Sequence, residues 1–391
     1  MLSVSQSPPR SIWIASGAVA IASIAVAAIA IPHAAAAAQP AKAPVVGAIG
    51  PSLVAVTCPS VTQCTAIDPD GEQLTFNPAS PRVATARRIE PSFDPANAVV
   101  DVSCPATTQC TAVDVTGIEM TFDPHSSGRA TSFRVDPNDV HSISCPTISQ
   151  CTVGGIGAYV VTFNPDATTS EPTFGAVVSG KAQLSDMACP TPGQCTAVGS
   201  AGDQEQFVTF DPNQTGVQQG SSMPATAPLL GVDCASPAQC TAVGKSGQEL
   251  TFNPTAPGTP ASVVSPGNPG NSLAGIACPA STQCTAVDHS GHQVTFDPTK
   301  PGGQSVTRID GDNQLTAVAC PSVTQCTAVD DRGRSVTFNP TSPASPTAVQ
   351  IDRHPSAKHL SALRRAIAKC DKLATGKRAK CVISARKRFD R

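Results

Sequence analysis

One unit repeated seven times restricts the fold of this chain more than any other feature. Its last copy runs from Val318 to Pro340 and reads VACPSVTQCTAVDDRGRSVTFNP. Each copy holds a Cys-x5-Cys pair, a turn with Gly, and Thr-Phe followed by Asn or Asp and then Pro. The first cysteines lie 41 to 46 residues apart, at Cys58, Cys104, Cys145, Cys189, Cys234, Cys278 and Cys320. A period of this length is typical of a four-stranded propeller blade.

Three strands per unit can be placed from the hydrophobic pattern, and a weaker fourth follows the proline. In the last copy the first strand is Leu315–Val318, the second is Gln325–Val329, and the third ends at Phe338. The fourth strands are predicted at Ala84–Ile89, Ala130–Val135, Ser305–Ile309 and Thr347–Ile351. With 37 Pro, 29 Gly and only 14% charged residues, the sequence predicts an all-β fold. We expect a seven-bladed β-propeller of four-stranded blades over residues 52–351.

Fourteen of the sixteen cysteines lie in the repeats, two in each copy. The five residues between them suit a hairpin loop, and we place the proline in its turn because proline cannot donate to a strand ladder. Facing hairpin positions bring Cα atoms within disulfide range. We therefore predict pairs within each repeat. They are Cys58–Cys64, Cys104–Cys110, Cys145–Cys151, Cys189–Cys195, Cys234–Cys240, Cys278–Cys284 and Cys320–Cys326, with Cys370–Cys381 in the tail.

Two further repeated features have structural explanations. Asp330 and Gly333 suit a turn that Asp opens through its own backbone and Gly closes in the left-handed region. Three copies lack the leading Asp, which argues against the alternative of a calcium-binding carboxylate ring. One Phe per copy suits packing between adjacent blades. These are Phe76, Phe122, Phe163, Phe210, Phe252, Phe296 and Phe338.

The motif S/A-C-P-x-x-x-Q-C-T-A-V-D-x-x-G-x-x-V-T-F-D/N-P resembles the cysteine-paired repeats of exported actinobacterial proteins. Those repeats are similar to the sialidase-like, Asp-box propeller superfamily, so the resemblance implies a propeller over about residues 52–351. The chain departs from the Asp-box itself, Ser-x-Asp-x-Gly-x-Thr-Trp. It has Asp-x-x-Gly instead, and no Trp follows Trp13.

The N-terminus has the pattern of an export signal. Arg10 precedes an apolar run over Ile12–Ile31 and an Ala-rich stretch, which predicts a signal peptide at 1–38 and a mature start near Gln39. An uncleaved anchor is the alternative, because about 20 apolar residues span a bilayer. Residues 39–51 are a linker or supply a closing strand, Val45–Ile49. An exported chain rich in cysteine is expected to be secreted or associated with the cell surface.

The last forty residues, 352–391, differ in composition from the repeats. They hold thirteen Lys and Arg against three Asp, while residues 1–351 are acidic. The spacing of Leu360, Leu363 and Ile367 predicts a short helical hairpin that Cys370 and Cys381 would join. A basic tail suits an anionic cell-surface polymer or lipid, or the acidic propeller itself. The lack of interleaved aromatic residues argues against nucleic acid.

No motif predicts catalysis. The chain lacks a nucleophile elbow and a His-Glu-x-x-His pattern. His289 and His292 flank Gly291, and we prefer an exposed turn to the alternative of a weak metal pair. Tyr159, which a sialidase-type nucleophile would require, is expected to pack in a third strand. We predict no cofactor, no metal site and no catalytic residue, and favour a protein that is not an enzyme.

The near-identity of the seven units favours a binding or scaffolding module at the cell envelope. The expected partner is an unidentified protein or polysaccharide, and the chain is expected to be monomeric. The alternatives are a carbohydrate-active, glycosidase-like enzyme and a lectin. Any specific function should lie in residues that differ between copies, such as His289, His292, Arg332 and Arg334.

Overall fold

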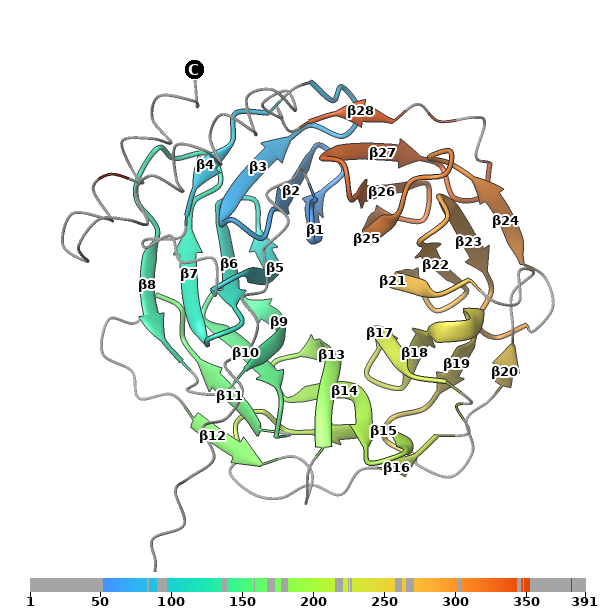
Figure 1. The fold of residues 1–391 in the computed structure, drawn as a ribbon. Coiled ribbons are helices and arrows are strands. Elements are labelled where there is room, and N and C mark those ends of the chain that lie inside the picture. Colours follow the sequence, from blue (N-terminus) through green and yellow to red (C-terminus); the bar gives the residue numbers. More distant parts are fainter. Residues whose placement is uncertain are drawn as a thin grey trace, which may run out of the picture. The chain divides into compact units, whose positions relative to one another are not determined.

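The fold is described by a computed structural model. It describes residues 52–351 and Cys381, except 83, 90–96, 136–138, 158, 167–172, 177–181, 215–220, 224, 226, 257–261, 265–270, 301–303, 343–345 and 347. The described strands form seven antiparallel sheets of four strands, here called blades one to seven in chain order. The blades stand around a common centre (Figure 1). The predicted seven-bladed, all-β propeller is therefore confirmed.

Each blade takes its four strands from consecutive stretches of the chain, and its outermost strand is short. Blades one to four contain β1 (Ala55–Ser60), β2 (Gln63–Ile67), β3 (Glu72–Phe76), β4 (Arg87–Arg88), β5 (Val99–Ala106), β6 (Gln109–Asp114), β7 (Ile118–Phe122), β8 (Thr131–Arg134), β9 (Val140–Thr147), β10 (Gln150–Gly155), β11 (Tyr159–Phe163), β12 (Thr173–Ala176), β13 (Ala182–Thr191), β14 (Gln194–Ala201), β15 (Gln204–Phe210) and β16 (Ser221–Ser222). Blades five to seven contain β17 (Leu229–Ser236), β18 (Gln239–Gly244), the 3-10 turn η1 (Lys245–Gly247), β19 (Glu249–Phe252), β20 (Ser262–Val264), β21 (Leu273–Ala280), β22 (Gln283–Asp288), β23 (His292–Phe296), β24 (Ser305–Arg308), β25 (Leu315–Ser322), β26 (Gln325–Asp330), β27 (Arg334–Phe338) and β28 (Val349–Gln350).

The first strand of each blade is longer than predicted, and the fourth is shorter. In blade one β1 continues through Cys58 and Pro59, and the turn holds only Val61 and Thr62. The prediction that the proline lies in the turn is therefore wrong. The strand register shifts between Thr57 and Ser60, and this irregularity accommodates a residue that cannot donate to the ladder.

The structure contains disulfides at all seven predicted positions within the repeats, with Cα atoms 4.0 to 4.1 Å apart. Each bond ties the first strand of a blade to the second, and the second cysteine of every pair is buried. In the tail, Cys381 is disulfide-bonded, whereas Cys370 lies outside the described residues.

The second turn of every blade needs a glycine in the left-handed region. Seven glycines have φ between 66° and 89° at these turns, namely Gly71, Gly117, Gly157, Gly202, Gly247, Gly291 and Gly333. Where an Asp opens the turn, its side chain binds the backbone that follows. In blade seven, Asp330 Oδ1 accepts hydrogen bonds from the backbone N–H groups of Arg332 and Arg334, at 2.9 and 2.8 Å. The Asp thus has the structural role predicted for it.

Hydrophobic clusters join each blade to the next. The cluster of blade two, for example, combines Phe122 and Met120 with Ala55, Ile67 and Ile89 of blade one. All seven repeated Phe side chains are buried, at 3 to 7% exposure, and each belongs to a cluster that spans two blades. The repeated Phe therefore packs between blades, as predicted from one large apolar residue per unit.

The Gln before the second cysteine makes a hydrogen bond that sequence reasoning left unexplained. In all seven blades its Nε2 donates to a backbone carbonyl in the cysteine hairpin of the next blade, at 2.7 to 2.9 Å. The bonds are Gln63–Thr107, Gln109–Ile148, Gln150–Pro192, Gln194–Pro237, Gln239–Ser281, Gln283–Val323 and Gln325–Val61. We call these seven residues the glutamine ring. Its last bond joins blade seven to blade one.

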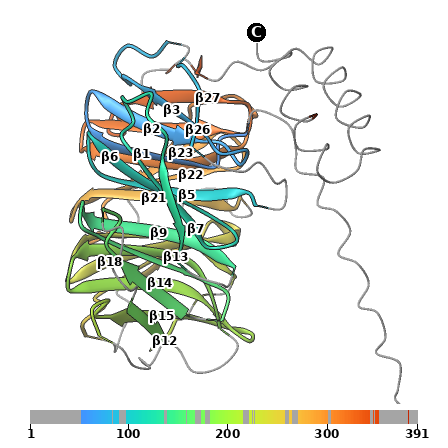
Figure 2. The ribbon, with the colours of Figure 1, turned by 90° about the vertical axis from the view of Figure 1, so that its left-hand side faces the viewer.

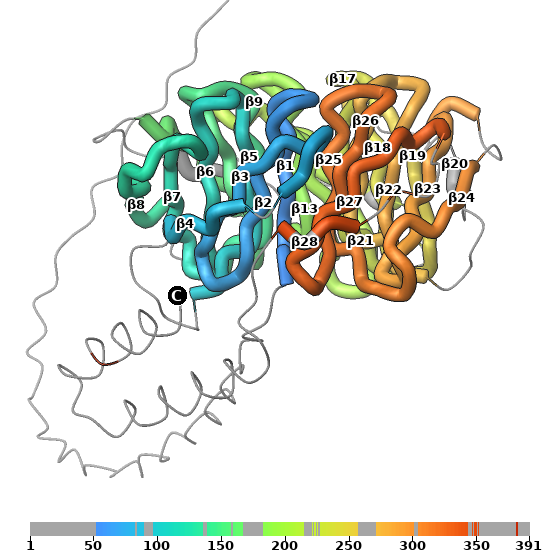
Figure 3. The backbone as a smooth tube through the Cα atoms, turned by 90° about the horizontal axis from the view of Figure 1, so that it is seen from above, coloured from blue at the N-terminus to red at the C-terminus, as the bar shows by residue number. Residues whose placement is uncertain are grey.

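The described residues close the ring without exchanging a strand between blades. Blade seven builds all four of its strands from its own repeat, and β1 contacts β25, with the two end blades side by side in Figure 3. The backbone N–H of Leu53 donates to Asp330 O at 3.1 Å, and Thr316 Oγ1 donates to Leu53 O at 2.6 Å. The predicted closing strand Val45–Ile49 lies outside the described residues.

Seen from its side, the ring presents the strands of successive blades one above another (Figure 2). No helix among the described residues has the length and apolar character needed to cross a membrane. The predicted signal at 1–38 and the helical tail, apart from Cys381, lie outside the described residues.

A buried carboxyl in blade two leads to a testable prediction. Glu119 is fully buried, and its Oε2 accepts a bond of 2.8 Å from Thr121 Oγ1 while its Oε1 has no partner. Burial raises its pKa to about 8. At the same strand position in blade one, Gln73 Oε1 accepts a bond of 2.8 Å from Thr75. An amide therefore fits this environment without a charge.

We expect Glu119→Gln to raise the free energy of unfolding by about 2 kcal/mol at pH 7.5 and by little at pH 4. A carboxyl with a raised folded pKa favours folding below its unfolded pKa, and this advantage disappears as the pH rises toward 8. Urea unfolding at several pH values measures the difference. Gln73→Glu is the matched reverse variant and should lose stability as the pH rises. A benefit of Glu119→Gln that is equal at all pH values would contradict the assignment.

Candidate functional site

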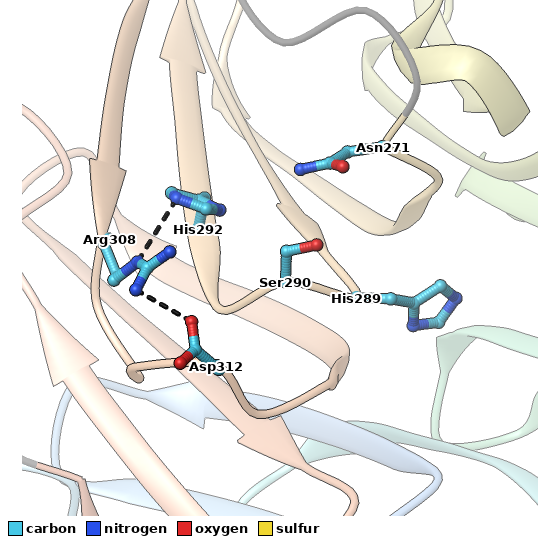
Figure 4. A pocket seen from close by; sticks show the side chains of 6 residues that line it. All are labelled: Asn271, His289, Ser290, His292, Arg308 and Asp312. Atoms are coloured by element: carbon cyan, nitrogen blue, oxygen red, sulfur yellow. Dashed lines mark hydrogen bonds and ion pairs between the residues drawn. The ribbon is translucent and has the colours of Figure 1, made fainter.

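Two of the surface clefts among the described residues are lined mainly by polar side chains. The first, of about 320 Å³, lies at the second turn of blade six and is lined by Asn271, His289, Ser290, His292, Arg308 and Asp312. The side chains around it are shown in Figure 4. The second, of about 420 Å³, lies beside the cysteine hairpin of blade one. The second turn and the cysteine hairpin lie at opposite ends of the second strand of each blade, so the two clefts are at opposite ends of the blades.

The backbone of the blade-six cleft is the second turn of that blade, which Asp288 opens. Asp288 Oδ1 accepts hydrogen bonds of 2.8 Å from the N–H groups of Ser290 and His292. Gly291 has a φ of 80°, and an added Cβ would lie 2.2 Å from Gly311 O. Glycine thus lets the turn meet the loop that carries Asp310 and Asp312. The turn is common to several blades, but the side chains on it are specific to blade six.

His292 is held in one orientation by two neighbours. Its Nδ1 lies 3.2 Å from Asp288 Oδ2, which also accepts a bond of 2.8 Å from Asn271 Nδ2. Its Nε2 lies 3.5 Å from Arg308 Nε. Because a guanidinium can only donate, Nε2 is the acceptor and Nδ1 carries the proton that faces Asp288.

Arg308 is the cation of the cleft. Its guanidinium lies 2.8 Å from Asp312, and the two side chains are 53% and 88% exposed. Figure 4 shows Arg308 between His292 and Asp312, with both interactions drawn. Ion pairs this exposed contribute about 0–1 kcal/mol. The pair with Asp312 therefore contributes little to the stability of the fold.

The two histidines of the cleft have different environments. His289 is exposed, as predicted for a turn, whereas His292 is half-buried and hydrogen-bonded. The exposed-turn interpretation is therefore wrong for His292. Among the described residues no group of three or more His, Cys, Asp and Glu side chains is placed to hold a metal ion.

Arg334 was predicted as a functional residue because it varies between copies. In the structure it forms ion pairs within the ring. Its guanidinium lies 2.9 Å from Asp310 and 2.5 Å from Asp330, and both carboxylates are buried. Burial and the neighbouring Asp330 raise the pKa of Asp310 to about 7, although Arg334 opposes the shift. The Arg334–Asp310 pair joins blade seven to the loop that follows the last strand of blade six. Arg332 is exposed and does not line either cleft.

Two polar side chains of the second cleft are already hydrogen-bonded within the fold. His125 Nε2 lies 2.8 Å from Oε1 of Gln63, a member of the glutamine ring. Arg87 donates to Ser126 O at 2.6 Å. Both polar groups thus connect blade one to blade two. This cleft is a seam between blades, and we favour the blade-six cleft as the candidate binding site.

Three carboxylates on the innermost strands were not predicted as functional or structural residues. Each Oδ2 accepts a backbone N–H from the next blade: Asp101 from Ile143 at 2.9 Å, Asp186 from Val232 at 2.8 Å, and Asp233 from Cys278 at 2.7 Å. Burial raises the pKa of all three, to about 7 for Asp101 and about 6 for Asp186. At the centre of the ring these bonds connect blade two to blade three, blade four to blade five, and blade five to blade six.

Tyr159 does not pack as predicted. Its side chain is 48% exposed, because it stands at the start of β11, beside the second turn of blade three. Among the described residues it does not line either cleft. No described side chain therefore supports a sialidase-type nucleophile in these clefts.

Comparisons with known proteins give the class of the fold. No family model matches the sequence, and no curated protein matches it. The structure is similar to one described as "YCF48 bound to D1 peptide", with a TM-score of 0.59, 12% identity, and coverage of 74% of this chain and 94% of that chain. It is also similar to the WD40 repeats of RRP9, with a TM-score of 0.58, 10% identity, and coverage of 77% and 94%. At these identities the likeness shows the fold alone, which is that of a β-propeller.

Proposed function

We propose that this chain is an exported, disulfide-bonded propeller that acts as a binding or scaffolding module at the cell envelope. One observation carries the proposal. The polar residues repeated in all seven blades are used in structural bonds, while the non-repeated polar residues of blade six line an exposed cleft. The glutamine ring is one such set. Seven Thr–Thr pairs, buried in four blades and partly buried in three, are another, with Oγ atoms 2.9 to 3.1 Å apart. A stable ring with one specialised surface suits binding.

The disulfides support export, because such bonds persist in oxidising compartments and are rare in the cytosol. The proposed domain order is a signal peptide at 1–38, a linker at 39–51, the propeller at 52–351 and a basic tail at 352–391. N-terminal sequencing of the protein recovered outside the cytoplasm should give a start near Gln39. A chain that keeps residue 1 and fractionates with membranes would favour the uncleaved anchor instead.

The kind of partner we propose is a protein. One propeller of similar fold is described with a bound peptide, and the blade-six cleft offers polar groups rather than the stacked aromatic surfaces that sugars usually require. The relationship to sialidase-like propellers remains a proposal that rests on the repeat motif. Fluorescence-based screening against a glycan array tests the lectin alternative, and specific binding there would favour it over a protein partner.

The basic tail is proposed to hold the protein at an anionic surface. With about ten net positive charges, retention on isolated cell walls should weaken as salt screens the charges. We expect loss of retention when residues 356–391 are deleted. Sedimentation of the full-length and shortened proteins with walls at low and high salt measures this. Equal retention of both proteins would show that the tail is not the anchor.

A further inference from the structure

Blades one and six differ at the cross-strand pair that follows the second turn. In blade one, Glu72 on β3 stands opposite Arg88 on β4, and Glu72 Oε1 lies 3.4 Å from the Arg88 guanidinium. In blade six, His292 on β23 stands opposite Arg308 on β24. The two arginines thus occupy the same place in the blade. The carboxylate that faces the arginine in blade one is replaced by an imidazole in blade six.

The imidazole does not supply the missing negative charge. The Nδ1 proton of His292 faces Asp288, and its Nε2 receives Arg308 Nε. Among the described residues the carboxylate partner of Arg308 is Asp312, which stands on the loop to blade seven and is 88% exposed. The remaining lining groups, His289, Ser290 and Asn271, can donate hydrogen bonds. Blade six therefore presents an arginine and several donors around an open space.

We propose that the blade-six cleft binds a carboxylate side chain of an acidic peptide segment in a protein partner. The inference rests on the proposed binding function and names its ligand class. The ligand carboxylate takes the place that Glu72 has in blade one, pairs with Arg308 and releases Asp312 to solvent. A charge-assisted bond of this kind is stronger than a neutral one.

An extended peptide suits the surroundings of the cleft. Arg308 is the last residue of β24, which is an outer strand of its sheet. An outer strand offers backbone N–H and C=O groups that an added strand can pair with. Val306 lies two residues before Arg308, hence on the same face of the strand, and is 39% exposed. The preferred segment should carry an apolar residue two positions from its acidic residue.

Isothermal titration of the full chain with a synthetic peptide of Glu, Val and Ser tests the proposal. The peptide should bind at low salt, and the peptide with Gln in place of Glu should not. His292→Glu installs the blade-one arrangement and should reduce affinity about tenfold or more, because the site then holds its own carboxylate. Blade one already accommodates Asp68, Glu72 and Arg88 together, so this variant is expected to fold.

Asp312→Asn provides a test in the opposite direction. It removes the competing carboxylate from an exposed loop, so affinity for the Glu peptide should rise several-fold. Arg88→Gln is the matched control in blade one and should leave affinity unchanged. Loss of affinity in Asp312→Asn, equal binding of the Gln peptide, or full competition by inorganic phosphate would each overturn the proposal. Failure of peptide binding with intact retention on cell walls would leave the envelope function standing.

Discussion

Reduction of the seven intra-blade disulfides is expected to unfold the propeller. In the chain-entropy model each seven-residue loop contributes about 2.4 kcal/mol. Together the seven contributions exceed the total stability of about 5–15 kcal/mol that is typical of a folded domain. The blades have few aromatic residues, at 4% of the sequence, which leaves less apolar contact to replace the bonds. Each bond also fixes the hairpin whose carbonyl receives the glutamine of the preceding blade.

The experiment compares two samples unfolded in denaturant, one oxidised and one reduced and alkylated. After dilution the oxidised sample should regain the β-sheet circular dichroism signal, and the alkylated sample should not. A milder variant, Cys104→Ala with Cys110→Ala, removes one bond and should lower the free energy of unfolding by about 2 kcal/mol. Refolding of the alkylated chain to native stability would contradict the role we give to the disulfides.

The second large effect is expected for Arg334→Met. This change leaves the buried carboxylates of Asp310 and Asp330 side by side without their cation. Removing one partner of a buried ion pair costs about 3–5 kcal/mol. Since Arg334 opposes the rise in the pKa of Asp310, its loss should raise that pKa further.

The pH dependence identifies the cause. A raised carboxyl pKa means that stability is retained below the unfolded pKa, near 4, and is lost as the pH rises through 7. The deficit of Arg334→Met, measured by urea unfolding, should therefore be largest above pH 7 and smaller at pH 5. Adding Asp310→Asn to Arg334→Met should restore part of the stability. A deficit that is independent of pH and unrelieved by Asp310→Asn would point to lost packing instead.

The architecture could be predicted because it depends on features that recur with the repeat. The features that recur are two cysteines per unit, a Gly in each second turn and one Phe per unit. Each acts within a blade or between neighbouring blades that share the motif. Seven copies thus specify seven blades. The end of the first strand was misplaced because Pro59 suggested a turn, whereas an irregular register accommodates it inside the strand.

The candidate site could be predicted only in part, because it depends on contacts between residues that do not recur. His292 was singled out as a departure from the repeat, but its partner Arg308 lies on a fourth strand whose pattern is weak. Arg334 departs from the repeat equally, yet Asp310, 24 residues away, engages it in the ring. His292 and Arg334 are distinguished only by the strand register and by the path of the loop that carries Asp310.

The glutamine ring, in contrast, consists of residues that recur in the sequence but whose hydrogen-bond partners could not be predicted. Gln325 and its six counterparts recur in every copy, so the sequence contained the signal. Their acceptors are backbone carbonyls of the next blade, and a backbone carbonyl has no signature in a sequence. Among the inner carboxylates, Asp101 and Asp186 stand three residues before the first cysteine of their repeats and Asp233 one residue before it. The other repeats have no Asp at these positions, so no periodic pattern indicated them.

Our central claim is that repeated residues build the ring and that the unique residues of blade six bind. Its most direct test measures the stability and the Glu-peptide affinity of Gln325→Ala and His292→Glu side by side. Gln325→Ala loses the bond to Val61 that joins blade seven to blade one, and should lower the free energy of unfolding by about 1 kcal/mol without changing affinity. His292→Glu should lose affinity while its stability stays near that of the unchanged protein. Loss of affinity in Gln325→Ala at unchanged stability, or full affinity in His292→Glu, would contradict the claim.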